Sequence, residues 1–154
     1  MLYTTFAKAK EDNACTGSYK KMAKYLGGVR KYGEDKPIPL DEVLKVCGLQ
    51  DAIWSLGCTT EPSEDILIEF ACRCAEHVLH IFEDKYPDDK RPRQAIEAAK
   101  LCITDKSTTA WAAAGTAAWA ARTAAWAART AAGAAWAAET EWQSQTLLEL
   151  IGGK

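Results

Sequence analysis

Two cysteines and both histidines of the chain lie within one short stretch, Phe70–His80. Thiolate and imidazole groups are ligands that zinc prefers, and a structural zinc site needs four of them to converge. On a continuous helix, Cys74, His77 and His80 spread around the surface. Cys72 points away from all three. We therefore interpret the stretch as structural, with buried thiols and surface histidines, and expect neither a metal nor a cofactor.

The other patterns typical of catalysis are weak or missing from the sequence. Cys72 and His80 have the residue types of a thiolate–imidazole pair, but no third residue is evident to orient them. No glycine-rich phosphate loop follows a strand, and the chain has no Gly-x-Ser-x-Gly segment. We find no catalytic residues and expect a protein that is not an enzyme.

A charged turn lies between two helical segments in the middle of the chain. Its carboxylates are expected to join Glu69 and Glu76 in a salt-bridge network with the neighbouring arginines, because such charge clusters on helix surfaces are most often ion pairs. The turn is also a secondary binding candidate, with four residues that would make the contacts: Asp88, Asp89, Arg91 and Arg93.

A seven-residue repeat gives the C-terminal part of the chain its most specific pattern. The unit Thr-Ala-Ala-Trp-Ala-Ala-Arg occupies residues 116–122 and again 123–129, and a third, interrupted copy begins at Thr130. At about 100° per residue, the tryptophans and arginines fall on one side of a helix. We call this set the Trp/Arg stripe and predict that it binds a partner: Trp119, Arg122, Trp126, Arg129 and Trp136.

Three interpretations of the Trp/Arg stripe remain open at this point. The tryptophans can pack on the preceding helices while each arginine stem lies along a ring. Alternatively, the stripe faces a partner, since tryptophan and arginine are enriched at interface hot spots and a buried guanidinium needs a counter-charge. Self-association through the stripe is the third interpretation.

The elements that must position these residues are helical. Alternation typical of strands is nearly absent, whereas helix start and stop signals recur. A helix through Tyr19–Leu26 should stop at Gly27-Gly28, and two short helices should cover Leu40–Cys47 and Leu49–Leu56. The residues between Tyr32 and Pro39 read as a loop.

Two longer helices should follow, the first with Pro62 in its first turn and an end at Pro87, the second opened by Pro92. The first should bury an apolar face that recurs every three or four residues: Leu67, Phe70, Ala71, Cys74, Val78 and Ile81. The second should bury Ile96, Ala99 and Ile103.

An alanine-rich segment completes the chain. From Ala110 to Glu139, 18 of 30 residues are alanine, the strongest helix former. Ser107 or Thr108 can cap such a helix. We predict an all-α fold of five to seven helices in a single domain over 1–154. Residues 1–106 would form a bundle of short helices, and 107–151 one long helix that packs on the bundle or projects from it.

Composition limits the classes of partner and the compartment. The net charge of −2 over 154 residues argues against a sequence-specific nucleic-acid binder, although residues 1–36 carry +4 and indicate a weak basic face. No stretch is apolar enough to span a bilayer, and the start lacks the features of a signal peptide. We expect a cytoplasmic protein whose six cysteines are reduced.

Several segments are similar to a known family. They include Cys-Ala-Glu-His-Val-Leu at 74–79, Tyr-Pro-Asp-Asp at 86–89 followed by Arg-Pro-Arg at 91–93, and segments at 48–54 and 141–150. Together with the alanine-rich tail, they resemble a bacterial and phage family labelled "putative immunity protein" over most of residues 14–151. The resemblance implies a small, all-helical protein that binds and neutralises another molecule in bacterial conflict, and its occurrence in phages would imply counter-defence.

Two functions from different classes follow from these observations. The leading hypothesis is a binding or inhibitor protein that blocks a bacterial or host protein through the Trp/Arg stripe, in the host cytoplasm if a phage encodes it. The alternative is a sponge for a small anionic nucleotide, in which indole rings stack on a base and Arg122 or Arg129 binds a phosphate, at an interface between copies of the chain. A third hypothesis, with less support from the sequence, is a hydrolase or metal protein that uses Cys74, His77 and His80.

Overall fold

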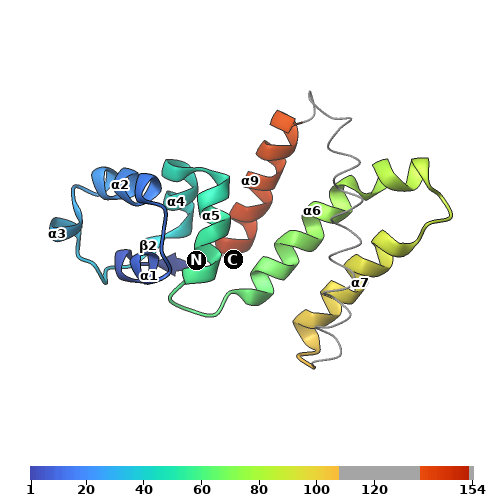
Figure 1. The fold of residues 1–154 in the computed structure, drawn as a ribbon, viewed down its shortest axis with the longest axis horizontal. Helices are drawn as coiled ribbons and strands as arrows, with labels where there is room; N and C mark the ends of the chain where they lie inside the picture. Colours follow the sequence, from blue (N-terminus) through green and yellow to red (C-terminus); the bar gives the residue numbers. More distant parts are fainter. Residues whose placement is uncertain (108–135, 153–154) are drawn as a thin grey trace. The chain divides into compact units, whose positions relative to one another are not determined.

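The computed structural model describes residues 1–107 and 136–152, with side chains in the second range described from residue 138 onward. These residues are mostly helical, in agreement with the predicted all-α class (Figure 1). In chain order the elements are β1 (Tyr3–Thr4), α1 (Phe6–Glu11), α2 (Thr16–Tyr25), α3 (Val29–Tyr32), β2 (Ile38–Pro39), α4 (Leu40–Cys47), α5 (Leu49–Ser55), the 3₁₀ turn η1 (Leu56–Cys58), α6 (Glu64–Lys85), α7 (Arg91–Thr104) and α9 (Trp136–Gly152).

Local signals in the sequence account for most of these boundaries. Gly27 and Gly48 adopt positive φ angles of 81° and 96°, which glycine reaches without a steric penalty, and they follow α2 and α4. Pro92 lies in the first turn of α7, as predicted. The described residues alone contain eight α-helices, more than the five to seven predicted, because short segments such as α1 and α3 form helices of their own.

One pair of short strands was not predicted. β1 and β2 pair antiparallel, with Tyr3 opposite Pro39 and Thr4 opposite Ile38, and β2 lies in the segment that we expected to be a loop. Each strand has two residues, which is too short for an alternating pattern to be read from the sequence.

The chain divides into two compact units. Unit 1 comprises Met1–Leu67 and Gln143–Lys154, and unit 2 comprises Ile68–Trp142. The prediction of a single domain stays a prediction, as does the long helix over 107–151: α9 lies within that range, but residues 108–135 are outside the described residues.

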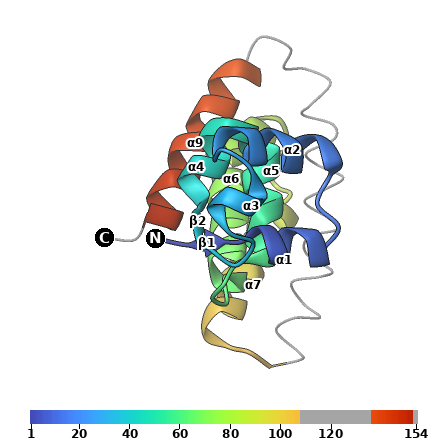
Figure 2. The same ribbon diagram turned by 90° about the vertical axis from the view of Figure 1, so that its left-hand side faces the viewer.

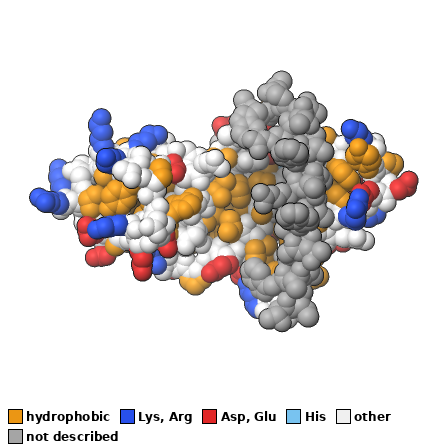
Figure 3. All heavy atoms as spheres, in the orientation of Figure 1, with side chains coloured by type: hydrophobic (Ala, Val, Ile, Leu, Met, Phe, Trp, Pro, Cys, Tyr) orange, Lys and Arg blue, Asp and Glu red, His pale blue; other side chains and the backbone are white. Residues whose placement is uncertain are grey.

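The core of unit 1 forms around Phe6, where α1, α2, β2 and α4 meet. Phe6 is 2% exposed, and its ring contacts those of Tyr19 and Tyr32 edge-on at centroid distances of 5.1 and 6.1 Å. Met22, Ile38 and Val43 complete the buried cluster. Figure 3 shows lysine and arginine side chains at the α2–α3 end of this unit, with acidic side chains beside them. The weak basic face therefore stays a prediction.

The end of α9 belongs to unit 1. Leu147 and Ile151 are 0% and 1% exposed, so both side chains are fully inside that unit. The backbone N–H of Leu2 donates a hydrogen bond to the carbonyl of Ile151 at 3.0 Å, beside β1 (Figures 1 and 2). Residues far apart in the sequence therefore close one core.

Unit 2 contains most of α6 and all of α7, and the two helices form a hairpin. Its buried cluster comprises Cys72 and Leu79 from α6 and Ile96 from α7. Ile68 and Ala75 pack against them, so the buried positions on α6 follow the spacing 68, 72, 75, 79 typical of one helix face.

This burial corrects the predicted faces of both helices. On α6, Phe70 is buried as predicted, whereas Leu67, Ala71 and Ile81 are exposed. Cys72 is buried, although it was not part of the predicted apolar face. The helix carries two apolar stripes, and the pattern alone could not decide which of them packs against α7. On α7 the buried residue near the end is Cys102, while Ile103 is half-buried.

All six cysteines are unpaired, and Cys58, Cys72 and Cys102 are buried. Burial raises the pKa of Cys72 and, despite a hydrogen bond between its thiol and Thr4, that of Cys58, which disfavours ionisation of both thiols. Within the described ranges, no helix has the length and apolar content needed to cross a membrane.

Candidate functional site

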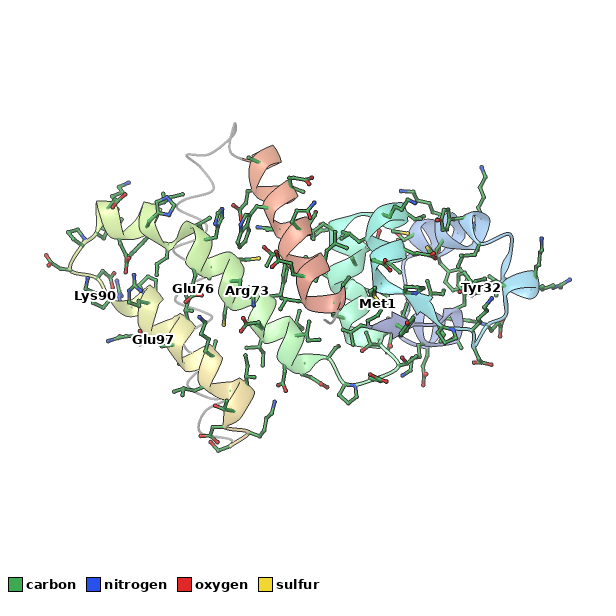
Figure 4. All side chains as sticks on the ribbon, turned by 180° about the vertical axis from the view of Figure 1, so that it is seen from behind. Met1, Tyr32, Arg73, Glu76, Lys90 and Glu97 are labelled. Atoms are coloured by element: carbon green, nitrogen blue, oxygen red, sulfur yellow. The ribbon has the colours of Figure 1, made fainter. Side chains whose placement is uncertain are left out.

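The turn between α6 and α7 contains the secondary binding candidates predicted from the sequence. Pro87 follows the end of α6, and Pro92 lies in the first turn of α7. Proline is tolerated at both places, because neither requires a backbone N–H for a hydrogen bond within the helix. Inside the turn, the N–H of Asp89 donates to the carbonyl of Tyr86 at 3.1 Å, and Nζ of Lys90 donates to the carbonyl of Pro87 at 2.7 Å. The turn is therefore held by its own hydrogen bonds (Figure 4 labels Lys90).

Asp89 and Arg91 form a two-point ion pair at the start of α7. Arg91 Nε lies 2.8 Å from Asp89 Oδ1, one terminal nitrogen lies 2.5 Å from Oδ2, and the Arg91 backbone N–H also donates to Oδ1 at 3.1 Å. The hydrogen bonds from the Arg91 side chain and backbone lower the pKa of Asp89 to about 2. The Arg91 side chain is nevertheless 78% exposed, so this guanidinium is both ordered and accessible.

The depressed pKa of Asp89 leads to a testable prediction. A carboxylate titration followed by NMR should give a midpoint near 2 for Asp89, and Arg91→Ala should move it up toward the ordinary value of 3.8. Because the folded pKa lies below the ordinary one, the contribution of the pair to folding is complete above 3.8 and is lost as pH falls through 2. A midpoint near 3.8 in the unmodified chain would contradict the ion pair.

Two further ion pairs join α6 to α7. Arg93 donates from Nε and a terminal nitrogen to the two carboxylate oxygens of Glu83 at 2.8 and 2.6 Å, and Lys100 donates to both oxygens of Glu76 at 2.7 and 2.8 Å. Figure 4 shows Glu76 on the side of α6 that faces α7. Because these ion pairs are exposed to solvent, they contribute little to the stability of the hairpin. Their main effect is on which residues of α6 lie opposite which residues of α7.

The predicted acidic cluster around the turn is therefore only partly correct. Asp89 pairs with Arg91 as expected, but Arg93 pairs with Glu83, which was not among the predicted carboxylates. Glu76 binds Lys100, and Glu69 pairs with Arg73 at 2.8 Å. Nine residues separate Glu76 from the end of α6, roughly 14 Å at 1.5 Å per residue, which is too far for it to reach the turn. Asp88 is exposed.

Apolar side chains lie beside these charges. Tyr86 and Ile81 are 47% and 46% exposed, and the Tyr86 ring packs on that of Phe82 at a centroid distance of 5.0 Å. Lys85 Nζ lies 5.5 Å from the centre of the Tyr86 ring. At this end of unit 2, hydrophobic, acidic and basic side chains share one surface (Figure 3). We call residues 81–93 the hairpin tip. Its charged residues were predicted from the sequence, whereas the exposure of Ile81 and Tyr86 was not.

A second cluster joins α6 to the first turns of α9. The His77 and Trp142 rings stack at a centroid distance of 3.8 Å and an angle of 7°, and His77 Nε2 lies 3.4 Å from Glu139 Oε2. Burial, together with the negative charge of Glu139, raises the pKa of Cys74 to about 11. Sequence reasoning missed Trp142 and Glu139, because only the tertiary fold brings them to His77.

The stretch Phe70–His80, which contains two cysteines and two histidines, does not form a metal site in the part of the chain that the structure describes. No three cysteine, histidine or carboxylate side chains converge there in a way that could hold an ion. His80 Nδ1 lies 3.1 Å from the backbone carbonyl of His77, and the Cys72 thiol points to the carbonyl of Ile96 at 3.9 Å. A thiol whose pKa is about 11, as for Cys74, is a poor ligand at neutral pH.

Most of the Trp/Arg stripe is beyond the described residues. Trp119, Arg122, Trp126 and Arg129 lie within 108–135. Trp136 begins α9, but its side chain is not described. The binding role of the stripe therefore stays a prediction from the sequence.

The chain matches one known protein family over more than half of its length. The family described as "Imm-5 like putative immunity protein" matches residues 57–141, more than half of the sequence. The chain belongs to this family. The match contains the α6–α7 hairpin and also the range that holds the Trp/Arg stripe, and it confirms the resemblance read from the motifs. No curated protein and no solved structure matches the chain.

Proposed function

We propose that the chain is a non-enzymatic, cytoplasmic protein that binds and neutralises a protein partner in bacterial or phage conflict, as an immunity or counter-defence protein. The observation that carries this proposal is the family match over residues 57–141. It coincides with the part of the chain where the hairpin tip and the Trp/Arg stripe lie, the two segments whose residue types suit an interface.

The Trp/Arg stripe is the proposed main contact. Indole rings bury a large apolar area at a small entropic cost, and guanidinium groups form two-point hydrogen bonds with carboxylates. Residues of these two types dominate interface hot spots. Trp119, Arg122, Trp126, Arg129 and Trp136 combine them on one predicted helix side.

The hairpin tip is the proposed second contact. Its ion pairs order Arg91 and Arg93 before any partner arrives, so binding there would cost little side-chain entropy. Exposed Tyr86 and Ile81 next to these charges give the mixed apolar and charged surface typical of a transient interface. The tip is supported by described geometry, whereas the stripe is supported by sequence.

The test is capture of the partner. The tagged chain is mixed with bacterial lysate, and the proteins and small molecules that it retains are identified together by mass spectrometry, with the tag alone as the control. We expect one protein to be retained in a fixed ratio to the chain. Retention of a small anionic nucleotide in its place would overturn the proposal in favour of a ligand sponge.

A further inference from the structure

Unit 1 contains a pocket of about 50 Å³ that has no part in the proposed interface. Residues from β1, α1, α2, α4 and α5 line it, all of them outside the matched range 57–141. Three aromatic residues, Phe6, Tyr19 and Trp54, are among its lining residues, and so are two cysteines, Cys15 and Cys47. The pocket therefore brings together two cysteines that are far apart in the sequence.

Cys15 is the exposed thiol among the six cysteines. It caps α2, where its sulfur accepts a hydrogen bond from the backbone N–H of Ser18 at 3.3 Å and lies 3.2 Å from the Ser18 hydroxyl. The Ser18 hydroxyl donates its proton to Asp51 Oδ2 at 2.7 Å. Hydrogen bonding with the Ser18 side chain and backbone lowers the pKa of Cys15, which increases its thiolate fraction at neutral pH.

Cys47 lies at the end of α4 and contacts the same serine. Its thiol donates to the backbone carbonyl of Ser18 at 3.7 Å. Burial, with the nearby negative charges of Asp51 and Cys15, raises the pKa of Cys47. The two thiols therefore differ in character, since Cys15 is exposed and has a lowered pKa, while Cys47 is half-buried and has a raised pKa.

We propose that Cys15 and Cys47 are a redox-active pair that hydrogen peroxide oxidises to a disulfide across this pocket. The Cys15 thiolate attacks one oxygen of the peroxide, the O–O bond breaks, and the departing hydroxide takes up a proton to become water. Cys15 is then a sulfenic acid. The Cys47 sulfur, losing its proton, attacks the Cys15 sulfur, and the S–O bond breaks to release a second water. Two thiols are oxidised and one peroxide is reduced to two waters.

The remaining cysteines are poor competitors for the oxidant. Cys58, Cys72 and Cys102 are buried. Cys74 is half-buried, and its pKa of about 11 leaves almost no thiolate at neutral pH. The first disulfide formed by the folded chain is therefore specific to the pocket.

The experiment uses the full-length, fully reduced chain and hydrogen peroxide as the probe. After limited oxidation, the protein is denatured, the remaining thiols are alkylated, and the products are mapped by mass spectrometry. We expect a loss of two hydrogen atoms, a linked pair of peptides containing Cys15 and Cys47, and alkylation of the other four cysteines. Dithiothreitol should restore all six thiols.

Variants separate the two steps. Cys47→Ser should stop at an oxidised Cys15 that dimedone traps, and Cys15→Ser should lose the reaction. Cys74→Ser, a matched control, should still form the Cys15–Cys47 disulfide. A first disulfide between any other cysteines, or an unmodified Cys15, would overturn the proposal. So would sulfenic acid on Cys15 that persists beside a free Cys47 in the unsubstituted chain, and mapping of that chain decides the question even if a variant fails to fold.

Discussion

Replacing Arg122 and Arg129 together by alanine is expected to weaken partner binding by a factor of at least about 30, with the melting temperature unchanged. An interface hot spot loses 2 kcal/mol or more when truncated, and that energy corresponds to this factor. Arginine stems contribute little to a core, so the double variant removes partner contacts without disturbing the fold. The measurement is a titration of the purified variant against the protein that the unsubstituted chain captures.

The matched control removes two arginines elsewhere. Arg30 in α3 is exposed, and Arg73 in α6 pairs with Glu69. Alanine at both positions changes the net charge equally and should leave the affinity within a factor of about three, since surface substitutions rarely exceed 0.5 kcal/mol.

Trp126→Ala adds a second criterion. If Trp126 lies in a core, the variant should lose about 3–5 kcal/mol of stability, whereas at an interface it should lose affinity for the partner. A large stability loss would favour the packing interpretation of the stripe.

Leu147→Ala is expected to lower the free energy of unfolding by about 2–5 kcal/mol. Leu147 is 0% exposed inside unit 1, so the truncation removes buried methyl groups and leaves a cavity in a core that both ends of the chain complete. Urea unfolding followed by circular dichroism measures the change.

Leu101→Ala is the matched control for this prediction, because it makes the same chemical change at a side chain that is 60% exposed. It should alter the free energy of unfolding by no more than about 0.5 kcal/mol. Equal losses in the two variants would contradict the assignment of Leu147 to the core.

Local features of the sequence predicted much of the fold. The bounds of α4 at Leu40–Cys47 agree with those read from the sequence, because a glycine with positive φ ends that helix. The start of α6 was less exact: the helix begins at Glu64 and Pro62 precedes it. Helix ends depend on a few neighbouring residues, and these are readable without knowledge of the tertiary structure.

Features that depend on packing were not predictable in the same way. α6 presents two apolar stripes at helical spacing, and only its contact with α7 decided that Cys72 and Leu79 are buried while Ile81 is exposed. The stacking of His77 on Trp142 joins residues from different helices, and so does the Cys15–Cys47 pocket. The charged residues of the hairpin tip could be identified from the sequence. Which of them form ion pairs could not, because that depends on how far each residue lies from the turn along α6.

Hydrogen–deuterium exchange of the chain, with and without the captured protein, tests the proposed interface most directly. Exchange is compared peptide by peptide at saturating partner. If the Trp/Arg stripe and the hairpin tip form the interface, peptides covering residues 116–139 and 81–93 should exchange more slowly in the complex, with unit 1 peptides around residues 15–47 unchanged. Protection confined to unit 1, or no protection at 116–139, would contradict the account.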